Sequence, residues 1–270
     1  MKRTLRYLLL VAVLLLCIGP FLWQLSTSLK GVGEDIYSNP PRLFPAEPTV
    51  TNYTRVADVV PVWRFAFNSL LVAVANVLLN CVGAAMAGYA LARLRFRGRR
   101  AALGAFVLSL LVPGEAIMIS LFLMMRSLSL DDTLVAVVLP GAVAALNVLL
   151  MRNAFARQSR AVEEAALIDG ATTWQRFSRI AVPSAGGTLA VVAILSFMFS
   201  WDDFLWPLIV LRNPENYTLT IGLNYLQGTF ASDQRLVAAG TIIAVAPLLA
   251  LFICLQRYFF RGAGEGAVKG

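Results

Sequence analysis

The chain has 270 residues, of which 59% are hydrophobic and 14% charged, and its formal net charge is +8. A soluble domain is about 25% charged, so most of this chain must have lipid as its solvent, which excludes a soluble enzyme or a DNA-binding domain as its overall description. The sequence contains no histidine, the commonest general base and metal ligand, and it predicts neither a catalytic nor a metal site.

Six stretches are long and apolar enough to cross a bilayer, which takes about 20 helical residues. The expected spans lie near residues 7–29, 67–92, 101–125, 134–152, 184–210 and 236–260. The sequence therefore predicts an all-α polytopic membrane protein with six transmembrane helices, organised as a single transmembrane domain over residues 1–270.

The direction of the spans follows from the basic residues of the short loops, which collect on the cytoplasmic side of a membrane. Most of the 23 lysine and arginine residues fall in the two tails and in the loops after spans two and four. Both termini are therefore expected to be cytoplasmic. The positive charge is explained by this topology and predicts no nucleic-acid partner.

The first span begins after Lys2 and Arg3, a start that it shares with secretory signal peptides. Its apolar run continues past Pro20 to Trp23, and no small-residue cleavage site closes it. It is therefore expected to stay as the first transmembrane helix. The outer loop that follows, residues 30–66, is rich in proline and is expected to hold no stable helix.

Ionisable side chains inside a span are costly and mark candidate functional positions. Glu115 follows Pro113 near the middle of span three, where the helix is expected to kink or break, and the positive end of a following half-helix would favour its charge. A structural hydrogen bond at the break is the alternative role. Asn147 in span four, like Asn76 and Asn80 in span two, suits either a polar pathway or interhelical hydrogen bonding.

The longest cytoplasmic loop, residues 153–183, predicts a helix–turn–helix at the membrane surface. Ser159 is placed to cap a short first helix, whose first turns carry Glu163 and Glu164 near the positive end of the helix dipole. Gly170 ends that helix by supplying the left-handed conformation. The acidic side chains are expected to face the cytoplasm, and a plain amphipathic surface helix is the simpler alternative.

The second helix of this loop is expected to begin at Thr172, with Gln175 three positions later completing a capping box. Trp174, Phe177 and Ile180 then fall on one helical face, as the 3.6-residue period requires.

Span five carries two adjacent carboxylates, Asp202 and Asp203, in its outer half between Trp201 and Trp206. Tryptophan is typical of membrane interfaces. The pattern therefore fits either an aromatic belt with hydrated carboxylates or polar positions on a pathway. A second outer loop, residues 211–235, follows.

The cytoplasmic loop also matches a known pattern over some twenty positions. The matching residues are Glu164-Ala165-Ala166, Asp169-Gly170-Ala171, and then Phe177, Ile180 and Pro183. Their spacing resembles the EAA loop of ATP-binding-cassette importer permeases. Val182 departs from that pattern, in which leucine usually precedes the proline.

Other segments extend the resemblance over nearly the whole chain. They lie at residues 68–70, 88–93, 200–207 and 266–270, and they are similar to the carbohydrate branch of that family, of the maltose type. Asp202 stands where this branch often has asparagine.

The resemblance implies the type I importer fold and a permease subunit of an ATP-driven, binding-protein-dependent sugar importer in a bacterial inner membrane. In that family two related permeases, usually a heterodimer, form the pathway. Two cytoplasmic ATPase subunits bind beneath them, and an extracytoplasmic sugar-binding protein delivers the sugar.

The resemblance also assigns roles to residues. The EAA loop is the coupling helix that docks on the ATPase, which implies a contact through Glu163, Glu164, Ala165, Ala166, Asp169 and Gly170. The candidates for the substrate path are Glu115, Asn147, Trp201, Asp202 and Asp203.

The sequence holds no phosphate-binding loop of the G-x-x-x-x-G-K-[ST] type. We therefore expect no cofactor in this chain, with ATP and Mg bound by the partner ATPase, and a non-catalytic transport subunit. A proton-coupled secondary transporter is the alternative, but it would usually need a titratable relay. A membrane-embedded enzyme would need a nucleophile–base pair or a metal cluster.

Overall fold

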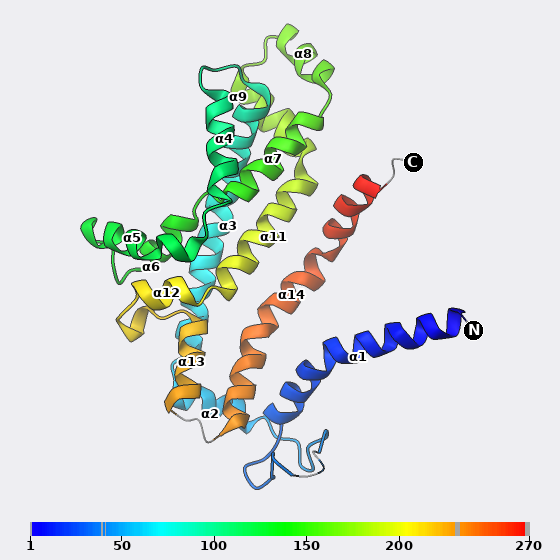
Figure 1. Cartoon of the computed structure of the whole chain (residues 1–270), viewed down its shortest axis with the longest axis vertical. Helices are drawn as coiled ribbons and strands as arrows, with labels where there is room; N and C mark the ends of the chain where they lie inside the picture. The colour runs from blue at the N-terminus through cyan, green and yellow to red at the C-terminus, as the bar shows by residue number, and fades with distance from the viewer. Residues whose placement is uncertain (1, 39, 41, 230–232, 268–270) are drawn as a thin grey trace. The chain divides into compact units, whose positions relative to one another are not determined.

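The computed structural model describes residues 2–38, 40, 42–229 and 233–267, and the regular structure of this part is helical throughout (Figure 1). The last three positions of the 266–270 segment lie outside the described residues. The chain falls into two compact units, one made of Met1–Ala66 and Thr218–Leu249 and the other of Phe67–Tyr217 and Ala250–Gly270. The single-domain organisation stays a prediction.

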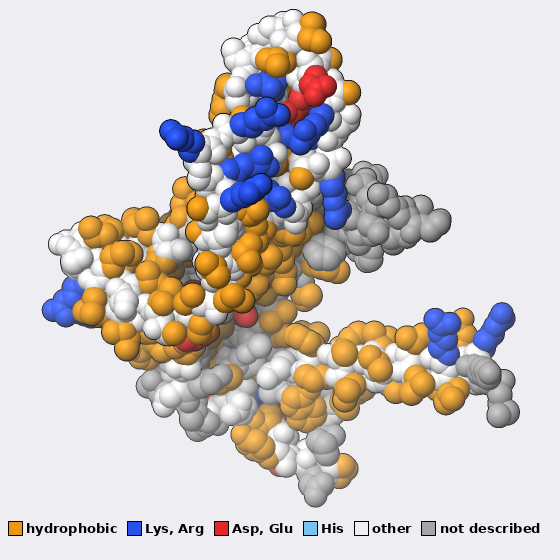
Figure 2. Space-filling view, turned by 45° about the horizontal axis from the view of Figure 1, so that its top comes forward, with side chains coloured by type: hydrophobic (Ala, Val, Ile, Leu, Met, Phe, Trp, Pro, Cys, Tyr) orange, Lys and Arg blue, Asp and Glu red, His pale blue; other side chains and the backbone are white. Residues whose placement is uncertain are grey.

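The first unit begins with α1 (Lys2–Ser28), which is apolar on all its faces. None of its most apolar window is buried, and Leu16 is 78% exposed. Figure 2 shows hydrophobic side chains along this helix and basic side chains near its start. A helix that exposes apolar side chains all round is suited to lipid, in agreement with the expected first span.

The outer loop at 30–66 contains a helix, so the expectation of none was wrong. This helix, α2 (Thr51–Val59), lies wholly between Pro48 and Pro61. Proline disrupts a helix only where it interrupts the hydrogen-bonding pattern, and the residues between these two are free of it. The composition of the whole loop concealed this proline-free stretch.

Polar contacts join α2 to its own unit. The side-chain amide of buried Asn52 donates to the backbone oxygens of Ser28 (2.9 Å) and Lys30 (2.8 Å) at the end of α1. Arg55 pairs with Asp233 at 3.1 Å. These bonds satisfy carbonyls at the helix end that have no partner within α1.

The rest of the first unit comes from α13 (Leu219–Thr229) and the first part of α14 (Gln234–Ala267). The segment expected as a second outer loop, 211–235, is therefore largely helical. The described stretch Gln234–Cys254 of α14 is long and apolar enough to cross a membrane, in agreement with the sixth expected span.

The second unit is built around α3 (Val62–Arg93), whose residues from Phe67 onward belong to it. Its other elements are α4 (Arg99–Ser109), α5 (Gly114–Ser127), α6 (Leu134–Val138), η1 (Leu139–Gly141), α7 (Ala145–Arg157), α8 (Arg160–Ile168), α9 (Thr173–Gln175), η2 (Arg176–Ala181), α10 (Val182–Ser184), α11 (Gly186–Asp202), α12 (Leu205–Val210) and η3 (Pro214–Asn216). Figure 1 shows α8 at one end of this unit, past the ends of α4 and α7.

Three of the expected spans are bent rather than straight. The axes change direction by 106° between α4 and α5, by 44° before α7 and by 78° before α11. Three helices are long enough to cross a membrane alone, and six spans result if each bent pair counts as one. The break expected at Pro113 is confirmed, since α5 starts directly after it.

Span five ends earlier than expected. The helix α11 stops at Asp202, Asp203 has an extended backbone, and α12 is a separate helix. The Asp203 carboxylate accepts a bond from the backbone amide of Trp206 (3.4 Å). A short acidic side chain that bonds to nearby backbone amides favours a helix start over a helix interior, so the continuous span to residue 210 was a wrong expectation.

The core of this unit lies where α3, α7, η2 and α11 meet. Gly88 on α3 lets the backbone of α7 come close, because a Cβ at this position would lie 2.8 Å from the backbone nitrogen of Arg152. Tyr89 packs its ring against Phe155 (centroids 5.6 Å apart) and Phe177 (5.3 Å). The end of α3 is thereby fixed against two other elements.

The segment η2 (Arg176–Ala181) is a π-helix, which winds more loosely than an α-helix. Phe177 is buried within it, whereas Trp174 is exposed and Ile180 half-buried. These three side chains were expected on one face, and the rings of Trp174 and Phe177 do lie together, with centroids 5.3 Å apart.

Candidate functional site

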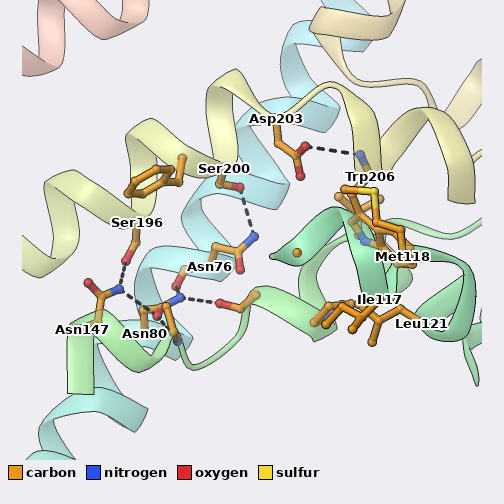
Figure 3. A pocket seen from close by; sticks show the side chains of 16 residues that line it. Asn76, Asn80, Ile117, Met118, Leu121, Asn147, Ser196, Ser200, Asp203 and Trp206 are labelled. Carbon is orange, nitrogen blue, oxygen red and sulfur yellow. Dashed lines mark hydrogen bonds between the residues drawn. The ribbon is translucent and has the colours of Figure 1, made fainter. Parts of the chain in front are cut away.

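A cavity of about 360 Å³ lies in the second unit, among α3, α5, α7, α11 and α12 (Figure 3). One wall is polar and comes from Asn76, Asn80, Asn147, Ser196 and Ser200. The facing wall is apolar, with Ile117, Met118 and Leu121 of α5. The cavity therefore presents uncharged hydrogen-bonding groups opposite a hydrophobic surface.

Hydrogen bonds between helices hold the polar wall in place. The Asn147 amide donates to the Asn80 side-chain oxygen (2.9 Å) and to the Ser196 hydroxyl (3.0 Å). The Asn76 amide donates to the Ser200 hydroxyl at 3.0 Å. The Asn80 amide donates to the backbone oxygen of Gly141 at 2.7 Å. The interhelical bonding expected of these asparagines is confirmed, and the same side chains line the cavity.

Asp203 and Trp206 also line the cavity. Besides the bond from the Trp206 amide to the Asp203 carboxylate, the Trp206 indole nitrogen donates to the backbone oxygen of Ala136 (3.1 Å). The indole is therefore held in one orientation, with its ring at the edge of the cavity. A fixed aromatic ring offers a flat surface for stacking.

The structure separates the five substrate-path candidates. Asn147 and Asp203 line the cavity, whereas Glu115, Trp201 and Asp202 do not. Glu115 is exposed in the first turn of α5, where its position relative to the helix dipole is as expected. Trp201 is buried and stacks on another ring, and Asp202 is exposed.

Ser196 and Ser200 were not predicted as lining residues. A signal for the two serines was present, because they are four residues apart on α11, as Asn76 and Asn80 are on α3. Side chains four apart share a helix face. Two such polar pairs in otherwise apolar helices indicate faces that turn away from lipid.

The second candidate site is the hairpin of α8 and α9, which follows the expectation closely. Ser159 is the N-cap residue of α8, although its side chain makes no capping bond. Gly170 has the expected left-handed conformation, with φ of +80°. Thr172 and Gln175 form the expected capping box, with bonds of 2.8 and 3.2 Å.

The two neighbouring glutamates of α8 point in different directions. Glu164 is exposed, whereas Glu163 is buried, with its carboxylate 3.2 Å from the Nε atom of Arg93. Both were expected to face the cytoplasm, and for Glu163 this was wrong. Successive helical residues are about 100° apart, so only one of the pair can point away from the end of α3.

The outward surface of the hairpin combines acidic and apolar side chains. Ala165, Asp169 and Gly170 are exposed with Glu164, and Ala166 is half-buried. Four large apolar side chains are also exposed, those of Val162, Leu167, Ile168 and Trp174, with Ile168 at 86%. An exposed apolar patch with charged neighbours is typical of a surface that binds another protein.

A second cavity, of about 410 Å³, lies between α8 and the end of α3. Its lining includes Arg95, Arg99, Arg160 and Arg176 with the two glutamates. Figure 2 shows basic side chains gathered around a small acidic group at the α8 end of this unit. The surroundings of Glu163 and Glu164 are therefore strongly basic.

Asp132 joins two loops away from the α8 end. Its carboxylate accepts bonds from the backbone amides of Arg212 and Asn213, each at 2.9 Å. Partial burial acts to raise the pKa of Asp132, but these two bonds, a bond with Asn216 and the nearby Arg212 charge outweigh it and hold the pKa below its ordinary value.

The chain matches the sequence model of a protein family described as "Binding-protein-dependent transport system inner membrane component" over residues 80–264. It is 38% identical over 208 residues to the "Arabinooligosaccharides transport system permease protein AraQ" of Halalkalibacterium halodurans, a match that covers 77% of this chain and 75% of that protein. It is 32% identical over 265 residues to the "Diacetylchitobiose uptake system permease protein DasC" of Streptomyces coelicolor, which covers 96% of each.

The fold is also similar to a solved structure, described as "Crystal structure of a bacterial ABC transporter involved in the import of the acidic polysaccharide alginate". A chain of that transporter superposes with a TM-score of 0.83 at 25% identity, and 96% of each chain is covered. The expected importer-permease fold is confirmed, and the proton-coupled secondary transporter is excluded. The chain belongs to the family of binding-protein-dependent transport system inner membrane components.

Proposed function

We propose that this chain is the permease subunit of an importer for a neutral oligosaccharide, and that its cavity forms part of the sugar pathway. The single observation that carries the proposal is the lining of the cavity. Amides and hydroxyls face an apolar wall, with an aromatic ring at the edge. Sugars combine hydroxyl groups with apolar ring faces, and this arrangement complements both.

Charge narrows the substrate class. The lining residues that the structure describes include the carboxylate of Asp203 and no basic side chain. An acidic sugar passing this wall would find no compensating cation among these lining residues. Two of the related permeases carry names that refer to arabinooligosaccharides and diacetylchitobiose, which are uncharged sugars, whereas the similar solved transporter is described as importing an acidic polysaccharide.

The partners follow from the same proposal. A second permease completes the pathway, usually as a heterodimer, and an extracytoplasmic binding protein supplies the sugar. Two ATPase subunits bind ATP and Mg and carry out the hydrolysis, so this chain is itself non-catalytic. The outward surface of α8, with Glu164, Ala165, Asp169 and Gly170, docks on one ATPase. Both termini then lie on the cytoplasmic side of a bacterial inner membrane.

The first experiment is capture of this chain from its native membrane through an affinity tag, with every partner identified by mass spectrometry. We expect an ATPase with a phosphate-binding loop, a second permease and a binding protein. Recovery of the chain alone, also after chemical crosslinking, would overturn the proposal.

The second step tests the substrate class on the captured binding protein. Its melting temperature is measured with a panel of neutral oligosaccharides and with a matched panel of uronic-acid oligosaccharides. A rise with a neutral sugar, and none with the acidic panel, is expected because ligands stabilise the state that binds them. The reverse pattern would contradict the neutral class while leaving the importer assignment intact.

A further inference from the structure

The last residue of α3, Arg93, is buried together with the carboxylate it meets. The Arg93 side chain is 5% exposed and that of Glu163 is 11% exposed, and their Nε and Oε1 atoms are 3.2 Å apart. An ion pair this deeply buried is costly to form and still more costly to break by removing one partner. The pair therefore connects α8 to the end of α3, and removing either partner would leave the other charge buried and unpaired.

The same arginine holds the start of the hairpin. Its Nη2 atom donates to the backbone oxygen of Gln158 at 2.6 Å. The side chain of Gln158 in turn donates to the backbone oxygen of Ala181 at 3.0 Å, at the end of η2. One guanidinium thus connects α3 to α8 directly and to the return segment of the hairpin through a second residue.

A packed layer of side chains supports this joint. Tyr89 lies one helical turn before Arg93, and its contacts with Phe155 and Phe177 join α3 to α7 and η2. The close approach of α7 at Gly88 adds a backbone contact. Close-packed interiors transmit displacement rather than absorb it, so a movement of α8 must move the end of α3.

The other part of α3 reaches the cavity. Asn76 and Asn80 belong to the same uninterrupted helix as Arg93. Seventeen residues separate Asn76 from Arg93, which corresponds to about 25 Å at 1.5 Å per residue. A single rigid helix therefore carries the α8 contact at one end and the polar wall of the cavity further along.

We propose that Arg93 and Glu163 are a positioning pair that transmits the movement of α8 to the cavity through α3. This inference rests on the proposed function. It assigns different roles to the two neighbouring glutamates: Glu164 meets the ATPase, and Glu163 acts inside the chain and never touches the partner.

The test uses the captured importer complex, with Cys17, Cys81 and Cys254 replaced by serine and one cysteine placed in the cavity wall by Met118→Cys. The rate at which a maleimide labels this cysteine is measured without nucleotide and with MgATP plus vanadate. Hydrolysis of MgATP and the amount of co-purified ATPase are measured on the same samples. We expect nucleotide to change the labelling rate about fivefold, a typical size for coupling between two sites.

The variant Glu163→Gln is expected to reduce this change to less than about twofold, while the ATPase still co-purifies and still hydrolyses ATP. Its matched control, Glu164→Gln, is expected to lower ATPase recovery instead. If Glu163 had a structural role alone, Glu163→Gln would not reduce the labelling response while leaving ATP hydrolysis intact. If Glu163→Gln does not accumulate in the membrane, Arg93→Lys replaces it in the test. This variant keeps the charge without the planar donors, and its change in labelling rate with nucleotide is expected to lie between those of wild type and Glu163→Gln.

A full labelling response in both Glu163→Gln and Arg93→Lys would overturn the positioning pair. Loss of the ATPase from Glu163→Gln would also overturn it, because that result would place Glu163 in the partner contact. A wild-type complex without ATPase, or without any response to nucleotide, would contradict the proposed function instead.

Discussion

The cavity and the α8 hairpin lie in the same unit, yet they are built from bonds of very different range. The bonds of the cavity wall join residues far apart in the chain, with separations of 49, 61, 67 and 124 positions. The capping bonds of the hairpin join residues three positions apart. The surface offered to a partner is thus a local motif, whereas the surface offered to a substrate exists only after the helices have packed.

The contact between α3 and α7 supports both regions, so breaking it should have the largest effect. In Gly88→Ala the new Cβ would lie 2.8 Å from backbone atoms of α7, which cannot move aside as a flexible side chain can. We expect a loss of about 3 kcal/mol or more, at the upper end of overpacking effects. The measurement is the thermal unfolding midpoint of the purified complex, together with its yield.

Gly104→Ala in α4 is the matched control, because no atom lies within 4 Å of its would-be Cβ. It should be neutral or stabilising by up to about 1 kcal/mol, since alanine favours a helix over glycine. Equal destabilisation by both substitutions would show that the α3–α7 contact is not special.

A change on the hairpin is expected to weaken the contact with the ATPase without disturbing the cavity. Glu164→Lys reverses an exposed charge that the proposed docking places against a basic surface of the ATPase. Like charges in an interface cost several kcal/mol, so we expect ATPase recovery to fall by at least about tenfold. Because Glu164 also lines the basic second cavity, the unfolding midpoint should fall modestly beside this loss of the ATPase.

Ala161→Lys, on an exposed position of the same helix, tests whether any added lysine has this effect. A similar loss from Ala161→Lys would remove the specific role of Glu164.

A change in the cavity wall should, conversely, lower sugar uptake without disturbing the hairpin. Asn147→Ala removes the bonds to Asn80 and Ser196. Interhelical hydrogen bonds of this kind are worth about 0.6 kcal/mol on average and at most about 1.7 kcal/mol, so the complex should assemble with its ATPase. Uptake of radiolabelled sugar into cells should fall severalfold, because the polar wall loses one of its donors.

The control for that change is Asn153→Ala on the same helix, at an exposed position away from the cavity. Normal uptake in Asn147→Ala would leave this residue a structural role alone.

The smallest effect concerns pH at Asp132, which belongs to neither region. Because its pKa is lowered in the folded chain, the carboxylate contributes stability above its unfolded pKa of about 3.9. That contribution is lost as the pH falls through the lower, folded pKa. Trypsin cleavage after Arg212 is therefore expected to be slow in wild type at neutral pH, where the contact between the two loops is intact.

Asp132→Asn keeps an oxygen acceptor but loses the charge, and it also tolerates the left-handed backbone found here, with φ of +62°. It should raise the cleavage rate at neutral pH about twofold to fivefold, in line with the modest value of hydrogen bonds to a charged group. An unchanged cleavage rate would show that the charge does not hold the two loops together.

The same difference in range explains what the sequence could predict. Gly170, Thr172 and Gln175 each act on backbone groups within a few positions, so their conformations followed from residue type and spacing alone. The break after Pro113 was predictable for the same reason. The size of the bends was not, since an angle such as 106° depends on what the two half-helices pack against.

The direction of Glu163 was equally out of reach. Whether it or Glu164 turns inward depends on where the end of α3 lies, and α3 belongs to an earlier part of the chain. The cavity wall was partly predictable, because polar residues four apart on α3 and α11 mark a shared face. Which of those faces meet was decided by packing alone.

The loosely wound turn η2 has a further consequence for how this chain tolerates changes of length. A π-helical turn accommodates one residue more than an α-helical turn of the same rise. A single deletion inside Arg176–Ala181 can therefore be absorbed by a return to α-helical winding, which leaves the serine face of α11 aligned with α3 and α7. A single deletion within α7 has no such reserve and would rotate everything beyond it by about 100°. The π-helix between hairpin and cavity thus contains one residue more than an α-helix would need. At this place homologous chains can differ in length by one residue without rotating the faces of the helix that follows.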